Sequence, residues 1–190
     1  MADRPDLPLI AWGNAIRSAR IRRERLRRRL AVGALGIAAL GAAIVAPPVP
    51  RLVWNASASA PIGLYVVNPG VSLAPGDMVI ARTPAPWRAL AARRHYLPAN
   101  VPLVKRVVAA RGDVICARGA AVSINGVAAV TRRARDARGR VLPWWEGCLG
   151  LAKDDAFLLM AGEEASFDGR YFGATRGHDI LGKAHLLWAR

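Results

Sequence analysis

The sequence contains a run of 21 residues without a charged side chain, at positions 30–50. Within it, residues 30–46 are 17 apolar or small residues, which as a helix would span roughly 26 Å, near the short end of what a bilayer requires. Pro47 and Pro48 are expected to end this helix. We interpret the run as a transmembrane anchor. A cleaved signal peptide and a buried core helix are weaker alternatives, because the run is long, starts late and lacks a polar face.

Eight arginines occur among residues 17–29, directly before the apolar run. Positive residues beside a membrane span favour the cytoplasmic side. We therefore expect an inner-membrane protein with a cytoplasmic Arg-rich tail (1–29), a single-pass anchor (30–49) and a periplasmic domain (50–190). Nucleic-acid binding is the alternative for the arginine block. We disfavour it because the block adjoins a membrane span and has few aromatic residues nearby to stack on bases.

Residues 50–190 show many short strand patterns separated by glycine and proline. The expected strands are residues 64–67, 78–81, 103–108, 113–116, 121–124, 127–130, 157–160 and 181–188. Asn125-Gly126 is a strong turn signal for a hairpin between the fifth and sixth of these strands. A short helix is expected at residues 84–94 and an exposed, charged loop at residues 131–140. The pattern predicts a mainly β fold, an antiparallel β-barrel-like domain or sandwich, after one transmembrane helix.

Lysine accounts for only three of the 28 basic residues, and Lys105 lies within the strand-like run 103–108. A desolvated lysine can lose its proton and act as a base, whereas an arginine stays charged. On a strand, Leu103 and Val107 would share a face with Lys105, and Arg106 would point away. An edge-strand lysine whose ammonium reaches solvent fits the same composition.

A serine nucleophile needs a base, and the segment at residues 55–61 offers two serines soon after the anchor. By composition alone, this segment is equally typical of a polar linker. The three histidines, His95, His178 and His185, lie in no recognisable catalytic motif, and the sequence has no Gly-x-Ser-x-Gly elbow. A Ser-His-Asp triad is therefore disfavoured, and a serine with a lysine base is the better hypothesis.

Cys116 and Cys148 both follow the anchor. In an oxidising compartment they can pair as a disulfide, with two free buried thiols as the alternative. Two cysteines without clustered histidines make a poor zinc site, so we expect no metal and no cofactor. For Trp144 and Trp145, packing in the core is favoured over contact with a membrane or a substrate.

Three blocks of sequence make the chain resemble the type I signal peptidase family, and more closely its TraF-like branch from conjugative transfer systems. The first block is Asn55-x-Ser57-x-Ser59-x-Pro61-x-Gly63-Leu64-Tyr65. The second is Gly76-Asp77 with residues 103–108 and 112–115, and the third is residues 166–173 with residues 180–184. The blocks occur in the family's order. The Ser-x-Pro spacing, Cys116, Asn125-Gly126 and Cys148 resemble the conjugative branch more than the housekeeping enzyme.

The resemblance implies a role for each matched residue. Ser59 would be the nucleophile, and Lys105 would be the neutral general base that later returns the proton to the leaving amine. The backbone N–H of Ser59 and the hydroxyl of Ser57 would form the oxyanion hole. Ser166 would hydrogen-bond to Lys105 and orient it.

The third block is expected to brace this site. Asp168 would do so by pairing with Arg170, although a tight surface turn is the alternative for residues 168–170. Two positions depart from the family pattern: Ala60 stands where methionine commonly follows the nucleophile, and Gly169 replaces the serine of Asp-Ser-Arg-Tyr. Neither removes a reactive group, and both are expected to affect how a substrate fits.

The sequence therefore predicts a membrane-bound serine endopeptidase that cleaves precursor proteins at the outer face of the inner membrane. The resemblance implies small residues before the scissile bond and a conjugative pilin or transfer-system subunit as the substrate. Other subunits of the conjugation apparatus are candidate partners. The alternatives are a general secretory signal peptidase and, in another class, a non-catalytic membrane-anchored scaffold of that apparatus.

Overall fold

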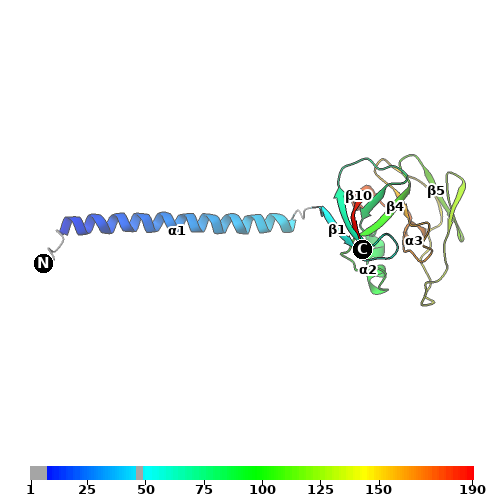
Figure 1. Cartoon of the computed structure of the whole chain (residues 1–190), viewed down its shortest axis with the longest axis horizontal. Coiled ribbons are helices and arrows are strands. Elements are labelled where there is room, and N and C mark those ends of the chain that lie inside the picture. Colours follow the sequence, from blue (N-terminus) through cyan, green and yellow to red (C-terminus); the bar gives the residue numbers. More distant parts are fainter. Residues whose placement is uncertain (1–7, 46–48) are drawn as a thin grey trace. The chain divides into compact units, whose positions relative to one another are not determined.

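The computed structural model divides the chain into two compact units, Met1–Pro48 and Val49–Arg190, and describes residues 8–45 of the first and all of the second. The described part of the first unit is one helix, α1 (Pro8–Val45) (Figure 1). Pro8 suits a first helical position, and the arginines, alanines and leucines that follow are good helix formers. The helix therefore includes the arginine block and begins well before residue 30. The predicted end at Pro47-Pro48 lies outside the described residues.

The apolar part of α1 is long enough to cross a membrane. None of its most hydrophobic 18-residue window is buried, and Leu35 and Ile37 are 72% and 73% exposed. Within its own unit, this helix is therefore not buried by any other described element.

The second unit is built on a six-stranded antiparallel sheet. In spatial order its strands are β1 (Leu52–Asn55), β2 (Gly63–Asn68), β10 (Ile180–Ala189), β3 (Met78–Ala81), β4 (Leu103–Ala109) and β9 (Phe157–Leu159). The strand β10 thus lies between β2 and β3. It joins the pair β1–β2 to the group β3–β4–β9.

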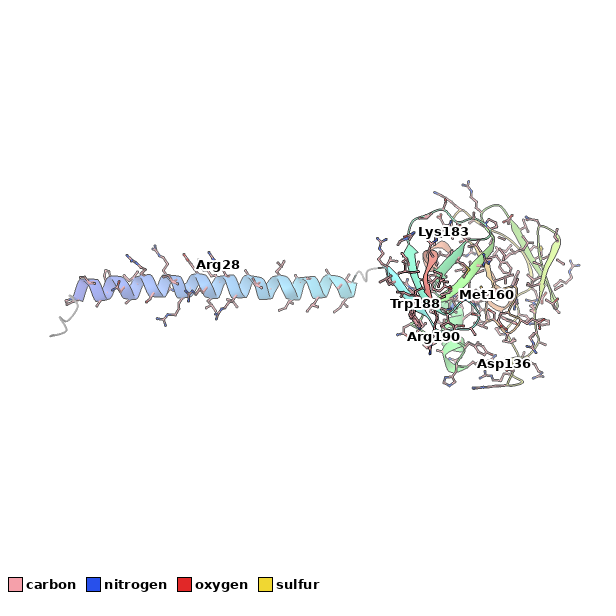
Figure 2. All side chains as sticks on the ribbon, in the orientation of Figure 1. Arg28, Asp136, Met160, Lys183, Trp188 and Arg190 are labelled. Atoms are coloured by element: carbon pink, nitrogen blue, oxygen red, sulfur yellow. A yellow bond between two sulfur atoms is a disulfide. The ribbon has the colours of Figure 1, made fainter. Side chains whose placement is uncertain are left out.

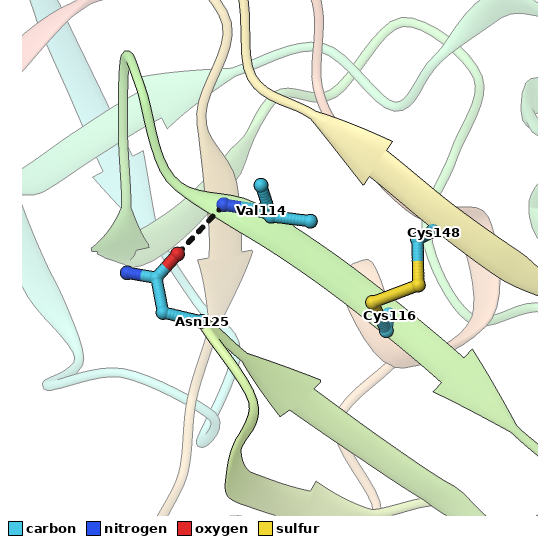
Figure 3. Close-up of a disulfide and its surroundings, with 4 residues drawn as sticks. All are labelled: Val114, Cys116, Asn125 and Cys148. Atoms are coloured by element: carbon cyan, nitrogen blue, oxygen red, sulfur yellow. Dashed lines mark hydrogen bonds between the residues drawn. A yellow bond between two sulfur atoms is a disulfide. The ribbon is translucent and has the colours of Figure 1, made fainter.

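A second, four-stranded antiparallel sheet is formed by the strands that lie between β4 and β9 in the sequence. Its spatial order is β7 (Val127–Thr131), β6 (Ala121–Ile124), β5 (Val114–Arg118) and β8 (Gly147–Gly150). Asn125 and Gly126 form the predicted turn between β6 and β7, and the Asn125 side chain accepts a 2.8 Å hydrogen bond from the Val114 backbone N–H (Figure 3). Cys116 and Cys148 face each other on β5 and β8 and are joined as a disulfide (Figure 3).

Three short helical elements complete the unit: α2 (Ala85–Arg93), α3 (Gly169–Phe172) and the single 3-10 turn η1 (Gly177–Asp179). The prediction of a mainly antiparallel β domain after a long apolar helix is confirmed. The strands β1 and β8 and the helix α3 were not predicted. Arg132 in the predicted exposed loop is 2% exposed, because its guanidinium donates to Glu146 and to the carbonyl oxygens of Gly119 and Trp145.

Side chains fill the interior of the second unit (Figure 2). One part of the core gathers around Tyr65, Ile80 and Val104, and another around Ile115 and Phe157. Trp145 is half-buried against the second part, with its ring 6.3 Å from that of Phe157, as expected for core packing. Strand β4 contributes to both parts of the core, through Val104 to the first and through Ala109 to the second.

Candidate active site

Lys105 lies in the middle of β4, which is paired with β3 on one side and with β9 on the other. Its side chain is on the same buried face as Leu103 and Val107, and Arg106 is exposed, as strand alternation predicts. Lys105 is only 4% exposed. The edge-strand alternative is therefore wrong for this lysine.

The Lys105 amine lies between two serine hydroxyls. Its Nζ is 2.9 Å from Ser59 Oγ and 2.8 Å from Ser166 Oγ. Both are within the range of a good hydrogen bond, although the residues come from three distant parts of the chain. The structure thus brings together Ser59, Lys105 and Ser166, as the sequence analysis expected.

Burial lowers the pKa of Lys105 from 10.5 to about 8. The cause is desolvation, because the charged ammonium loses water when it is buried. The negative charge of Asp168 opposes this shift and the positive charge of Arg170 adds to it. With this pKa, roughly a tenth of the molecules carry a neutral Lys105 at pH 7, far more than for a solvated lysine.

The loop that carries Ser59 is held by the side chain of Asn55, the last residue of β1. Asn55 Nδ2 donates to the carbonyl oxygens of Ser57, Ala60 and Pro61, at 3.0, 3.1 and 3.0 Å. Its Oδ1 accepts from the Ser57 backbone N–H at 3.1 Å. Sequence reasoning gave Asn55 no separate role. The signal for such a role was that Asn55 begins the first of the three sequence blocks that resemble the signal peptidase family.

Ser57 lies beside Ser59 in this loop. The two hydroxyl oxygens are 3.0 Å apart, and the Ser59 backbone N–H points at Ser57 Oγ over 3.4 Å. One N–H and one hydroxyl therefore converge next to Ser59 Oγ. The Ser57 side chain is exposed, so that a bound group can reach its hydroxyl.

Asp168 and Arg170 are both buried, at 0% and 2% exposure. The Asp168 carboxylate accepts backbone N–H groups of Met160 and Arg170, at 3.1 and 3.2 Å, and caps the start of α3. It lies 3.6 Å from the Arg170 guanidinium. Burial raises the pKa of Asp168, and the neighbouring positive charges oppose that rise. These residues and Gly169 are part of the core, so the surface-turn alternative is wrong.

Arg170 connects this core to the segment that carries Ser166. Its guanidinium donates to the carbonyl oxygens of Met160, Glu163 and Glu164, at 2.7, 2.8 and 3.2 Å. The Ser166 backbone N–H in turn donates to Glu163 O at 3.2 Å. Arg170 therefore fixes the turn from which the Ser166 hydroxyl reaches Lys105.

The two departures from the family pattern have a structural context. Ala60 is 5% exposed and packs in the same part of the core as Tyr65 and Val104. At Gly169, a Cβ atom would lie 2.6 Å from the Phe157 ring and 2.8 Å from the Leu158 carbonyl oxygen. Because real Cβ atoms do not approach so closely, the Phe157 ring and the missing side chain at Gly169 are fitted to each other.

The histidines do not take part in this arrangement. His95, His178 and His185 are all exposed, and none of them contacts Ser59 in the part of the chain that the structure describes. The described residues also contain no group of three His, Cys, Asp or Glu side chains placed to hold a metal ion.

Comparisons with known proteins agree with the motifs. Residues 25–189 match the family described as "Signal peptidase, peptidase S26". A "probable conjugal transfer protein TraF" from Sinorhizobium fredii is 32% identical over 140 residues, which cover 68% of this chain and 73% of that protein. A solved signal peptidase I from Enterococcus faecalis is 17% identical, with a TM-score of 0.35, covering 60% of this chain and 97% of that one.

The family match places the protein in the signal peptidase class. Because the match extends over most of the sequence, the chain belongs to the signal peptidase S26 family. Its relative places it with the TraF-like members of that family. The apolar helix α1 fits the membrane anchor of such a protein.

Proposed function

We propose that this protein is a serine endopeptidase in which Ser59 is the nucleophile and Lys105 is the general base. The observation that carries the proposal is the 2.9 Å contact between a buried, pKa-lowered lysine amine and the Ser59 hydroxyl. A general base must lie within hydrogen-bonding reach of the proton that it removes. Ser166 Oγ accepts a second hydrogen bond from Lys105 and so directs the amine at Ser59.

In the first step, neutral Lys105 takes the proton of the Ser59 hydroxyl while Ser59 Oγ attacks the carbonyl carbon of the scissile peptide bond. Lys105 becomes an ammonium and the carbonyl oxygen becomes an oxyanion. The Ser59 N–H and the Ser57 hydroxyl are the donors that stabilise this oxyanion. The Ser59 N–H points at Ser57 Oγ, so stabilising the oxyanion requires the Ser57 side chain to turn towards the substrate.

In the second step, the Lys105 ammonium gives its proton to the leaving amine, and the carbon–nitrogen bond breaks. An ester between Ser59 and the upstream part of the substrate remains, and Lys105 is neutral again. Lys105 then removes a proton from a water molecule, which attacks the ester carbonyl. Collapse of this second intermediate returns the proton to Ser59 and releases the new carboxyl terminus.

The surface of the second unit supports a position at a membrane. Trp54 on β1 and Trp188 on β10 are 44% and 60% exposed, with ring centroids 5.8 Å apart. Leu52 and Leu187 are exposed beside them in sequence. Tryptophan is favoured at membrane–water interfaces. We propose that this apolar surface faces the periplasmic leaflet of the inner membrane, with the arginines of α1 on the cytoplasmic side.

The name of the Sinorhizobium relative supports a substrate class. We propose that the protein matures a conjugative pilin or another precursor of the transfer apparatus. A polypeptide in extended form can lie along the exposed Ser57–Ser59 loop and present its scissile bond to Ser59.

The test is cleavage of a co-expressed pilin precursor by the full-length protein and by Ser59→Ala and Lys105→Arg. Lys105→Arg keeps the positive charge but cannot supply a neutral base. The exposed Lys153 provides the matched control, Lys153→Arg. We expect both site variants to accumulate in the membrane without cleaving the precursor, whereas the control cleaves it normally.

Each other result selects a different function. Normal cleavage by Lys105→Arg would show that the general-base assignment is wrong. Equal cleavage of unrelated secretory precursors by the wild type would favour a general secretory signal peptidase. If the wild type cleaves none of these precursors while its membrane level and partners are unchanged, a non-catalytic scaffold is the better description.

A further inference from the structure

We infer that an arginine-lined pocket beside Ser166 is a subsite for an acidic residue of the polypeptide substrate, an inference that rests on the proposed protease function. The pocket has a volume of about 240 Å³. It lies between the segment that follows α2, the loop at residues 133–142 and the segment at residues 164–171. Asp136, labelled in Figure 2, marks its loop wall.

The floor of the pocket is aromatic. The Phe167 ring lies 4.9 Å from that of Tyr96 and 5.8 Å from that of Tyr171, in a stacked arrangement with the latter. All three residues line the pocket. The Tyr171 hydroxyl accepts a hydrogen bond from the Arg133 backbone N–H at 3.2 Å and ties the floor to the loop. Such a floor suits the apolar stem of a side chain whose head group is charged.

The walls carry an excess of positive charge. Five arginines, one aspartate and one glutamate line the pocket. Asp136 is already neutralised: it accepts from Arg140 Nε at 2.7 Å, from the Tyr96 hydroxyl at 2.5 Å and from two backbone N–H groups. The remaining four arginines therefore face the single carboxylate of Glu164.

Two of these four arginines are held in place and two are available. Arg94 and Arg135 each donate to a backbone carbonyl oxygen, of Val141 and Gly139, at 2.7 Å. Arg133 and Arg138 are exposed, and within the described residues no hydrogen bond from either guanidinium is present. Two exposed arginines in a pocket that is also lined by aromatic rings are suited to a carboxylate, which arginine can bind through two parallel hydrogen bonds.

The pocket is linked to the proposed catalytic centre through the segment that carries Ser166. Ala165 and Phe167, which line it, flank Ser166, and the Ser166 hydroxyl contacts Lys105. Three or four residues of extended chain span about 10–14 Å. A substrate with its scissile bond at Ser59 can therefore place a nearby side chain in the pocket. The apolar Trp54–Trp188 surface belongs to β1 and β10, so the pocket's segments are not the ones proposed to meet lipid.

The test uses the full-length protein in phosphatidylcholine nanodiscs and pairs of fluorogenic peptides. Both peptides of a pair have small residues before the scissile bond. One has Glu and the other Gln at a single position, which lies three to five residues before or after that bond and differs from pair to pair. The test variant is the double substitution Arg133→Gln/Arg138→Gln. The control is Arg82→Gln/Arg118→Gln, which makes the same charge change at two exposed arginines outside the pocket.

We expect the wild type and the control to cleave the best Glu peptide about tenfold more efficiently than its Gln partner, mainly through a lower KM. In the test variant the Glu-to-Gln ratio of kcat/KM should fall to about one. Equal cleavage of every Glu and Gln pair by the wild type would overturn the inference, as would a preference that survives in the test variant.

Two further arms separate the remaining outcomes. If phosphatidylglycerol in the nanodiscs abolishes the preference for Glu, lipid head groups occupy the pocket, and the assignment to substrate is wrong. If the wild type cleaves no peptide, the proposed function fails. The binding of labelled peptides to Ser59→Ala then tests separately whether the pocket binds an acidic residue. Tighter binding of Glu peptides that depends on Arg133 and Arg138 supports the subsite, and equal binding refutes it.

Discussion

Lys105 and Arg170 are cations buried to the same degree, 4% and 2% exposed, yet their surroundings differ. The Lys105 amine donates to two neutral hydroxyls, whereas the Arg170 guanidinium donates to three carbonyl oxygens and lies 3.6 Å from a carboxylate. The hydroxyls compensate little of the lost hydration, so the pKa of Lys105 falls to about 8. Burial alone therefore does not make a cation reactive; the type of side chain and its hydrogen-bond partners decide.

Asp168 acts on both cations. It lies at hydrogen-bonding range of the α3 backbone, pairs with Arg170 and, through its charge, raises the pKa of Lys105 against the effect of burial. Under the proposed function, Lys105 takes part in the chemistry and Arg170 supports the site. Replacing each residue with the other type, in Lys105→Arg and Arg170→Lys, should test these two roles separately.

The largest expected effect is a loss of activity when Lys105 is replaced by arginine. Lys105→Arg should lower kcat/KM for a precursor by about 10⁴-fold, because a guanidinium cannot act as the base. Cleavage rates of full-length protein in detergent measure this change, and thermal unfolding verifies that the variant is folded. A loss of less than about tenfold in a folded variant would contradict the assigned role.

The reverse exchange should act on stability first. Arg170→Lys should lower the free energy of unfolding by about 3 kcal/mol, because one ammonium cannot reach the carbonyl oxygens of Met160, Glu163 and Glu164 together and leaves polar groups unpaired. Chemical denaturation monitored by tryptophan fluorescence measures it. Arg118→Lys on the exposed side of β5 is the control and should change little. Equal stability of both variants would mean that the Arg170 network contributes nothing net.

Removing the charge of Lys105 should instead stabilise the protein. Lys105→Met should raise the free energy of unfolding at pH 7 by about 3 kcal/mol, the value that corresponds to a pKa lowered from 10.5 to about 8. Between these two pKa values the unfolded lysine holds a proton that the folded one has lost, so wild-type stability relative to the variant should rise with pH. A difference that stays constant from pH 7 to 11 would show that the pKa is not lowered.

The smallest effect concerns the pH profile. For the wild type, kcat/KM should rise about tenfold per pH unit below pH 8 and level off above it, because the neutral form of Lys105 is the active one. Asp168→Asn removes the charge that raises this pKa, so the rising limb should move to lower pH. The exposed Asp154→Asn is the control. A limb that stays in place, or moves to higher pH, would show that Asp168 does not act on Lys105.

Sequence patterns predicted the strand alternation that buries Lys105 and the hairpin at Asn125, because both depend on neighbouring residues alone. They did not find β1, since Leu52–Asn55 reads as the start of a linker until its pairing with β2 is known. The fit between Gly169 and the Phe157 ring is likewise a contact between distant segments. The arginine-lined pocket was missed because its loop has few apolar residues and looks like a solvated segment.

The place of β10 in the sheet has a consequence for biosynthesis. Ser59 follows β1, Lys105 lies on β4, and the strand that joins their two groups is the last described strand to be synthesised. A nascent chain that ends before residue 180 would have both halves of the sheet without the strand between them. We expect Ser59 and Lys105 to stay apart until that strand is available, so an incomplete chain would be a latent enzyme rather than an unregulated one.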